Sequence, residues 1–426
     1  MKTLVILGLV LIAISAQNNY HGNMVLRINL ESEKQLEVFE KLENEGVIDV
    51  WSEKALIGGY HDVLVTPSNY QEFASKMFND LKTKYEVIIP NVQTLIDKEQ
   101  DRQNSLPEFT LNKFLASNDD GMEFFSKYRK PEEFDRFLTG LNQKFPKLTK
   151  LFSIGKTGQG KNINCLLIST SEGSNTTKPS IVYNGGQHAR EWISPMTNAY
   201  LANRMLHEYG KVDLTTKLIN SINWYIVPIV NVDGYTYTWS DDRLWRKTRS
   251  VNKGSKCVGV DPNRNWDYEW TSGGSSSNPC SESYRGPKPF SEPEVSAIAK
   301  LTTSVPNLKA YIDFHSYSQL WMRPWGFSRK VPAGDEAVGI VNDACGKAVY
   351  DVHGSKYTTG RIAVTIYEAS GSSVDYVFAK TNALSFAVEL RDTGRQGFLL
   401  DAKNIVPTGE EVFAAAVNVI GSKVIE

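Results

Sequence analysis

The chain lacks an excess of charge of either sign. Its 426 residues include 47 basic and 48 acidic ones, which give a formal net charge of −1. This balance excludes the general attraction to nucleic acid and to anionic membranes that a strongly basic protein has. The sequence also lacks basic runs, heptad arrays and internal repeats, and after its first residues no apolar run is long enough to span a bilayer. We expect a globular monomer that binds neither nucleic acid nor membrane.

Cysteine is scarce. The four cysteines, Cys165, Cys257, Cys280 and Cys345, do not have the spacing of a zinc site built from cysteine. Cys257 and Cys280 flank a loop rich in Gly and Ser, so we expect a local disulfide there. Cys165 and Cys345 are either buried thiols or a second bridge.

Two common hydrolase motifs are also missing. The chain has six histidines but no His-Glu-x-x-His helix, the pattern by which many zinc proteases hold their metal. It has no Gly-x-Ser-x-Gly elbow either, which leaves a serine hydrolase with little support.

The N-terminus has the pattern of a secretory signal peptide over residues 1–16. Lys2 is followed by an apolar core from Leu4 to Ile14 and by small residues that end at Ala16. Such a segment is too short to be a transmembrane helix, and cleavage after Ala16 is expected. We therefore expect a secreted, extracellular protein, in which Asn175 begins a glycosylation sequon.

Residues 17–113 are expected to form a small α+β open sandwich with a connector. The expected order is βαββαβ, with strands at 25–30, 47–51, 61–65 and 85–89, a helix at 33–44 and a second helix opened by a capping box of Ser68 and Gln71. The charged segment 96–113 follows and contains Lys98, Arg102 and Lys113, which we expect to be exposed. It is either a simple interdomain linker or a connector that a trypsin-like protease cuts.

Residues 114–426 are expected to form an α/β domain. A helix begins at Pro131, and apolar runs then alternate with helical patterns; the expected strands lie at 164–170, 180–186, 223–231, 309–315 and 383–390. Strands that are apolar throughout indicate a sheet covered by helices on both faces, here a mixed, mostly parallel, doubly wound sheet. Such sheets bind ligands at the carboxyl ends of their strands.

Four chemically suitable residues lie at three of these strand ends. His188 and Glu191 follow the strand at 180–186, His315 ends the strand at 309–315, and Glu389 lies near the end of the last strand. A catalytic zinc site has three protein ligands and an open position, which two imidazoles and one carboxylate supply. The remaining glutamate is then available as a general base.

Arginines add a second element to this site. Arg246, Asn263 and Arg264 follow in two nearby segments. If Asn263 and Arg264 face the crevice, a planar guanidinium suits the capture of a substrate carboxylate. If Arg246 faces it, a developing oxyanion has a stabiliser.

The chain resembles the zinc metallocarboxypeptidases of the pancreatic carboxypeptidase A and B type. Six ordered stretches carry the resemblance across about residues 120–420, and the small unit before them matches the activation segment of the family. They are NGGQHAREWISP, WRKTRS, GVDPNRNWD, DFHSYSQL, IYEASGSSVDY and ELRDTGRQGF.

The resemblance implies a role for each matching residue. His188, Glu191 and His315 would bind one Zn²⁺, Glu389 would be the general base, and Arg246 would stabilise the oxyanion. The terminal carboxylate of a peptide or protein substrate would be held by Asn263, Arg264 and Tyr367, and the neighbouring subsites would be lined by Arg190, Tyr317 and Phe398. Cys257 and Cys280 match the disulfide of the family. The activation segment would keep a secreted zymogen inactive until the connector is cut, with a mature start near Asn118 to Asp120. The digestive lumen is the common setting of the family, but storage-granule and plasma enzymes share the same motifs.

The resemblance also predicts the specificity. Relatives that release Lys or Arg have an aspartate at the base of the pocket, where this chain has Val374. The other matching pocket residues are uncharged: Met322, Gly326, Ile362 and Ala387. An apolar pocket disfavours a basic side chain, so we expect release of aromatic or aliphatic residues. A preference for Lys or Arg stays open, because Asp375 is adjacent to Val374.

The competing class is a peptide-binding relative without catalysis. Such a protein would lack the base or the residues that hold the carboxylate. Glu389, Arg246, Arg264 and Tyr367 are all present, which argues against this alternative.

Overall fold

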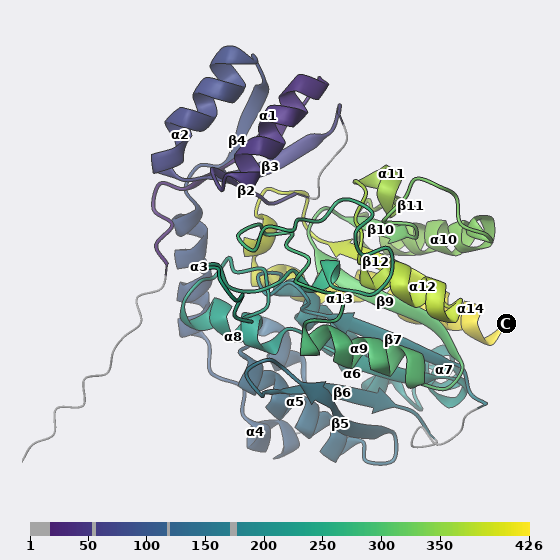
Figure 1. Ribbon diagram of the computed structural model, residues 1–426. Helices are drawn as coiled ribbons and strands as arrows, with labels where there is room; N and C mark the ends of the chain where they lie inside the picture. Colours follow the sequence, from purple (N-terminus) through teal and green to yellow (C-terminus); the bar gives the residue numbers. More distant parts are fainter. Residues whose placement is uncertain (1–17, 53–56, 117–119, 171–176) are drawn as a thin grey trace, which may run out of the picture.

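The computed structural model describes residues 18–52, 57–116, 120–170 and 177–426 (Figure 1). The expected signal peptide, the sequon at Asn175 and most of the expected mature start at 118–120 lie outside the described residues.

The small N-terminal unit has the predicted βαββαβ order. Its elements are β1 (Met24–Asn29), α1 (Glu33–Asn44), β2 (Ile48–Val50), β3 (Tyr60–Val65), α2 (Pro67–Ala74) and β4 (Lys84–Ile89). Within the described residues the strands form an antiparallel sheet in the order β2-β3-β1-β4. Phe39 of α1 and Phe73 of α2 are buried with Leu26 and Val63 of the sheet. The two helices therefore cover one face, and the other face is turned toward the large domain (Figure 1).

The start of α2 differs from the prediction. Thr66, and not Ser68, caps this helix, because the Thr66 side chain accepts a hydrogen bond from the Asn69 N–H and Pro67 occupies the first turn. Proline lacks an N–H and has a helical φ, so it is well suited to that first turn.

The charged connector is largely helical. It forms α3 (Val92–Ser105) and α4 (Leu111–Ala116), and α3 runs down the side of the large domain (Figure 1). Lys127 of that domain donates to the carbonyl oxygens of Gln103 and Leu106 at 2.8 and 2.7 Å. Lys98 and Lys113 are exposed, but Arg102 is half-buried, contrary to expectation, because it donates to the Ser126 carbonyl.

The described part of the large domain is built on an eight-stranded mixed sheet in the order β11-β10-β12-β9-β7-β8-β6-β5. The predicted strands are present as β6 (Asn162–Ile168), β7 (Ser180–Gly185), β8 (Asn223–Val227), β9 (Leu308–Ser316) and β12 (Leu384–Leu390). The central four, β12, β9, β7 and β8, are parallel. The remaining strands, β5 (Thr149–Lys156), β10 (Leu320–Arg323) and β11 (Thr358–Arg361), were not predicted. They lie at or near the sheet edges, and the two outermost are only partly buried, so they lack a continuous apolar run.

Helices cover both faces of this sheet, as predicted. Alternate residues of β7 point to opposite faces: Ile181 and Tyr183 belong to one core, and Val182 belongs to the other. The first core is covered by α5 (Pro131–Lys144), α6 (Ile193–Glu208), α7 (Asp213–Ser221), α8 (Val232–Ser240), α10 (Asp335–His353), α13 (Ile405–Val412) and the C-terminal α14 (Gly421–Ile425). The second is covered by α9 (Pro293–Ser304), α11 (Ile362–Thr365) and α12 (Ser373–Thr381).

The cysteines follow the expected local pairing. Cys257 and Cys280 form a disulfide. Cys165 and Cys345 are both buried free thiols, so the alternative of a second bridge between them does not apply. None of the helices in the described ranges combines the length and apolar character needed to cross a lipid bilayer.

Candidate active site

Two glycines shape the turn that follows β7. Gly186 has φ of +62°, a conformation that glycine adopts without strain. A Cβ atom on Gly185 would lie 2.4 Å from the Ser194 hydroxyl, so α6 could not pack this closely with a larger residue there. The chain therefore turns sharply between β7 and α6, and the turn carries His188 and Glu191.

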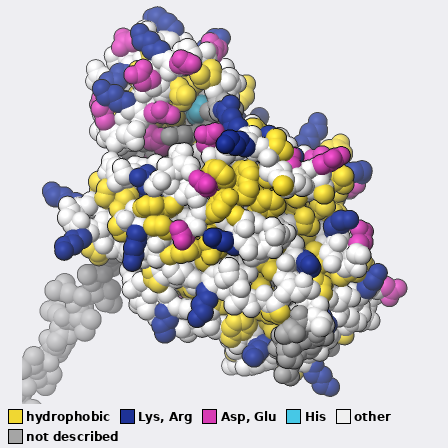
Figure 2. Space-filling model, turned by 45° about the vertical axis from the view of Figure 1, so that its right-hand side comes forward, with side chains coloured by type: hydrophobic (Ala, Val, Ile, Leu, Met, Phe, Trp, Pro, Cys, Tyr) yellow, Lys and Arg dark blue, Asp and Glu magenta, His cyan; other side chains and the backbone are white. Residues whose placement is uncertain are grey.

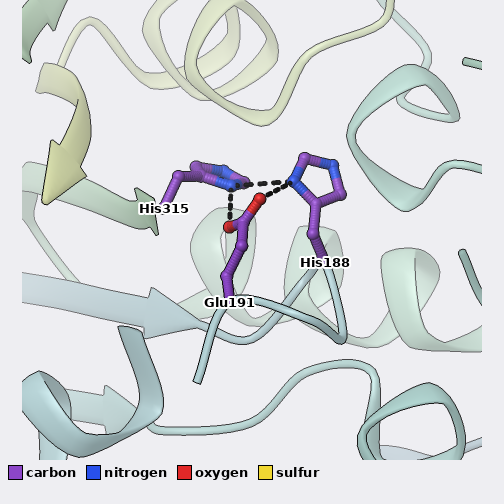
Figure 3. Close-up of side chains that lie close together, drawn as sticks. All are labelled: His188, Glu191 and His315. Carbon is purple, nitrogen blue, oxygen red and sulfur yellow. Dashed lines mark hydrogen bonds and ion pairs between the residues drawn. The ribbon is translucent and has the colours of Figure 1, made fainter. Parts of the chain in front are cut away.

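His188, Glu191 and His315 form a compact buried cluster (Figure 3). The Nδ1 atom of His188 lies 2.8 Å from Oε1 of Glu191, and the Nδ1 atom of His315 lies 3.0 Å from Oε2 of the same carboxylate. The two Nδ1 atoms are 3.1 Å apart. Two ring nitrogens and a carboxylate thus face one point, which is the donor set and number of a catalytic zinc site. The residues present fit the metal.

Two aspartates orient the imidazole rings. Oδ1 of Asp261 lies 3.0 Å from Nε2 of His188, and Oδ2 of Asp313 lies 2.9 Å from Nε2 of His315. Burial would raise the pKa of Asp261, but the neighbouring Arg246 and His188 outweigh it and hold that pKa well below its ordinary value. A carboxylate on the far nitrogen turns each Nδ1 atom toward the metal position. Neither aspartate was among the residues predicted from the sequence, although Asp313 lies two residues before His315, on the same side of the strand.

Glu389 lies next to this cluster because of strand register. In the parallel pair of β12 and β9, Glu389 is opposite His315. Its side chain is buried, with 4% of the residue exposed. The residue predicted to be the general base is thus buried on the strand next to the one that carries His315.

A cavity of about 410 Å³ opens beside the cluster, between the large domain and the N-terminal unit. Arg246, Arg264 and Tyr367, to which the resemblance assigns roles in the reaction, line it. Arg246 also donates to Asp261 at 2.9 Å and lies 3.9 Å from Glu191, so it connects the cavity to the metal cluster.

The residues predicted to bind a substrate carboxylate form one hydrogen-bonded group. Arg264 donates to the Tyr367 hydroxyl and to the Asn263 carbonyl. The Asn263 side chain lies 3.2 Å from His315 and accepts a hydrogen bond from the Ser373 N–H. The amide, the guanidinium and the phenol therefore lie together on one side of the cluster.

The N-terminal unit covers the remaining expected subsite residues. Asp49 forms an ion pair with Arg190 at 3.0 Å, and Trp51 packs on Phe398 with ring centroids 5.2 Å apart. The Tyr317 hydroxyl donates to Asp62 at 2.9 Å. The Arg190 guanidinium lies 4.2 Å from the centre of the Phe398 ring, and the Phe398 and Tyr317 rings are in contact.

The pocket residues expected from the resemblance share one apolar cluster. Val374 and Met322 are 1% exposed, and Ile362 and Ala387 belong to the same buried cluster. Asp375 does not point freely into it, because its carboxylate accepts hydrogen bonds from the N–H groups of Gly326 and Phe327, both at 2.9 Å. Burial raises the pKa of Asp375 to about 7, although these backbone bonds oppose the rise.

Comparison with known proteins places both parts of the chain. The family described as "Zinc carboxypeptidase" matches residues 134–415, and the family described as "Carboxypeptidase activation peptide" matches residues 26–99. Carboxypeptidase A1 of Mus musculus is 36% identical over 423 residues, which cover 99% of this chain and 98% of that protein. Carboxypeptidase A2 of Rattus norvegicus is 37% identical over 417 residues, with coverage of 97% and 96%.

Two solved structures share the whole architecture. The carboxypeptidase A from Helicoverpa armigera has a TM-score of 0.83 and 28% identity, and the match covers 95% of this chain and 98% of that one. Thrombin activatable fibrinolysis inhibitor has a TM-score of 0.83 and 31% identity, with coverage of 95% and 99%. The similarity therefore extends over the N-terminal unit as well as the large domain.

Replacement of His315 by Ala tests the metal cluster. Since two ligands alone hold zinc weakly, we expect the purified variant to lose its zinc on dialysis while the unaltered chain retains about one equivalent per molecule. Metal analysis gives the readout. His353, which is exposed and pairs with Glu410, provides the control in a His353→Ala variant; equal zinc content in both variants would contradict the assignment.

Proposed function

Because the chain belongs to the zinc carboxypeptidase family and carries that family's activation peptide, we propose that it is a secreted zymogen whose large domain releases C-terminal residues from peptides and proteins. One observation carries this proposal. Arg246 touches the metal cluster and lines the same cavity as Arg264 and Tyr367, so a site for hydrolysis adjoins a site for a carboxylate. Secretion is proposed from the signal pattern of residues 1–16. The digestive lumen is one compartment into which such an enzyme is secreted.

The reaction follows from the placement of the side chains. Zinc held by His188, Glu191 and His315 would polarise the carbonyl of the scissile bond and make water more acidic. Glu389 accepts the proton of the attacking water and returns it to the leaving amine as the C–N bond breaks. Arg246 donates N–H groups to the oxyanion that develops on the carbonyl oxygen.

The carboxylate group decides which end of a peptide is cut. Asn263, Arg264 and Tyr367 together offer amide, guanidinium and phenol donors to a terminal carboxylate, and Arg264 can bind it bidentately. A peptide bond within a chain has no such carboxylate. Recognition of this group therefore restricts the reaction to the last residue.

The pocket favours an apolar terminal side chain. Val374, Met322 and Ile362 supply apolar walls, and burying a Lys or Arg side chain against them leaves its charge unpaired. The carboxylate of Asp375 is already bound by two backbone N–H groups and favours its neutral form up to about pH 7. These contacts argue against the alternative preference for Lys or Arg.

The N-terminal unit acts as an inhibitor in the uncut chain. Asp49 pairs with Arg190, Trp51 packs on Phe398, and Asp62 accepts a hydrogen bond from Tyr317. The three contacted residues of the large domain are those expected to bind the part of the substrate before the scissile bond. Lys98 and Lys113 in the connector are exposed to a trypsin-like protease, and cleavage there would let the unit leave. The partners implied are a peptide substrate and an activating protease.

Replacement of Glu389 by Gln tests the mechanism. We expect at least about a 1000-fold loss of kcat, since glutamine cannot accept the proton, with the zinc content unchanged. The kcat is measured by peptide hydrolysis and the zinc content by metal analysis, in each case on trypsin-treated protein. The exposed Glu336, in a Glu336→Gln variant, is the control. Retained turnover in Glu389→Gln would refute this role.

Peptides that differ only in their last residue test the specificity. We expect kcat/KM to be at least about tenfold higher for a peptide ending in Phe than for one ending in Arg. Val374→Asp should raise kcat/KM for the Arg peptide, whereas Val374→Asn, which is polar but uncharged, should not. Faster release of Arg by the unaltered enzyme would refute the apolar preference.

Asp49→Asn tests inhibition by the N-terminal unit. The change leaves the buried Arg190 without its carboxylate, so we expect the activity of the uncut chain toward short peptides to rise about 3- to 10-fold. Asp80→Asn, on the exposed surface of the same unit, is the matched control. No rise in Asp49→Asn, or an equal rise in both variants, would contradict the blocking role of Asp49.

A further inference from the structure

Arg285 has a backbone that is held rigidly at the edge of the cavity. Its N–H donates to the Ser276 carbonyl at 3.0 Å. Its own carbonyl accepts hydrogen bonds from the side chains of Asn265 and Trp270, at 2.8 and 3.1 Å. The base of the side chain therefore has a defined position, although the residue follows a long disulfide-bonded loop.

The guanidinium groups of Arg285 and Arg264 line the same cavity and bind consecutive peptide groups of one loop. Arg285 donates from Nη1 to the Ser275 carbonyl at 3.4 Å, and Arg264 donates from Nε to the Gly274 carbonyl at 3.1 Å. Gly274 and Ser275 are consecutive, with Cα atoms about 3.8 Å apart, so neighbouring peptide groups bind the two guanidinium groups. The Ser275 hydroxyl also contacts that of Ser370 at 2.9 Å, which ties this loop to the segment after Tyr367.

The charge of Arg285 is not neutralised by a carboxylate. Most buried or half-buried arginines have an acidic partner, namely Arg27, Arg129, Arg190, Arg204, Arg243, Arg246, Arg323 and Arg391. Among the described residues, no carboxylate oxygen lies within 4.0 Å of the Arg285 guanidinium, whose Cζ lies 5.3 Å from the centre of the Trp270 ring. Arg246, Arg264 and Arg285 line one cavity, together with Glu282 and with Glu40 and Glu43 of the N-terminal unit. When that unit leaves, its two carboxylates leave with it. Three guanidinium groups then line the site with one glutamate, so Arg285 adds to a net positive charge there.

We propose that Arg285 is the outer half of a two-arginine anion site, of which Arg264 is the inner half. It attracts the terminal carboxylate of an entering peptide and increases its occupancy at Arg264. The pair also binds small dicarboxylates, with one carboxylate on each guanidinium. Arg285 is a positioning residue, since it does not touch the reacting atoms. This inference deepens the proposed carboxypeptidase function and rests on it.

Kinetics at two salt concentrations test the role of the charge. The full chain is loaded with zinc, activated with trypsin and assayed with a peptide that ends in Phe. In Arg285→Gln we expect KM to rise about 3- to 10-fold at low salt and less than about 2-fold at 0.5 M NaCl, because salt screens an exposed charge. We expect kcat to stay unchanged, and Arg285→Lys to keep most of the low-salt affinity.

The control is Arg249→Gln. Arg249 also stacks on aromatic rings, those of Tyr237 and Trp245, and has no carboxylate within 4.0 Å in the described ranges, but it does not line the cavity. We expect its KM to be unaltered. The proposal would be overturned if KM in Arg285→Gln matched that of the unaltered enzyme. It would also be overturned by a loss of kcat that is independent of salt, because such a loss indicates a structural role. If instead the proposed carboxypeptidase function is wrong, the unaltered protein itself will not hydrolyse the peptide.

Inhibition by glutarate provides a second, independent test. Glutarate has two carboxylates and valerate has one on a chain of equal length. We expect Arg285→Gln to weaken inhibition by glutarate about 10-fold and to change inhibition by valerate less than about 2-fold, because one charge-assisted pair is lost only for the dicarboxylate. Equal changes for the two compounds would overturn the two-arginine site.

Discussion

The parallel pairing of β7, β9 and β12 is the constraint on which the rest of the site depends. Parallel strands deliver their carboxyl ends to one edge of a sheet, and here that edge receives a ligand loop, His315 and Glu389. The register of β9 and β12 places Glu389 opposite His315, so the proposed base lies one strand away from a proposed metal ligand. A shift of one residue would turn either side chain to the opposite face of the sheet.

Charge compensation within the protein is the second constraint. The cluster and the cavity bury Arg190, Arg246 and Arg264, and each buried charge requires partners. Asp261 contacts both His188 and Arg246, so one carboxylate links a proposed metal ligand to the arginine proposed to stabilise the oxyanion. Arg190 takes its carboxylate, Asp49, from the N-terminal unit. In the proposed inhibition, the N-terminal unit supplies the carboxylate that the buried Arg190 requires, and a substrate would have to replace this partner after the unit leaves.

Local patterns were sufficient where neighbouring residues determine the structure. The small unit, the helix at Pro131 and the five central strands follow from apolar periodicity, because each buries a regular face. The patterns failed where tertiary contacts decide. The outermost strands β5 and β11 are only partly buried at the sheet edges. The cap of α2 is a different case, because its signal is local: Thr66 directly precedes Pro67, which occupies the first turn of the helix. The connector appeared to be polar, but α3 and α4 are held on the large domain by Lys127 and by the burial of Phe114.

The sequence by itself determined the chemical types of the site: two histidines, two glutamates and the arginines near them, in the order shared with a known family. Residue type and order are local properties, and strand ends can be recognised from apolar runs. Only the tertiary structure decided that Asp261 and Asp313 support the imidazoles, that Asp375 is bound by the backbone, and that Arg285 shares a loop with Arg264. These contacts join segments that are distant in the chain, and their distances depend on how the sheet and loops pack.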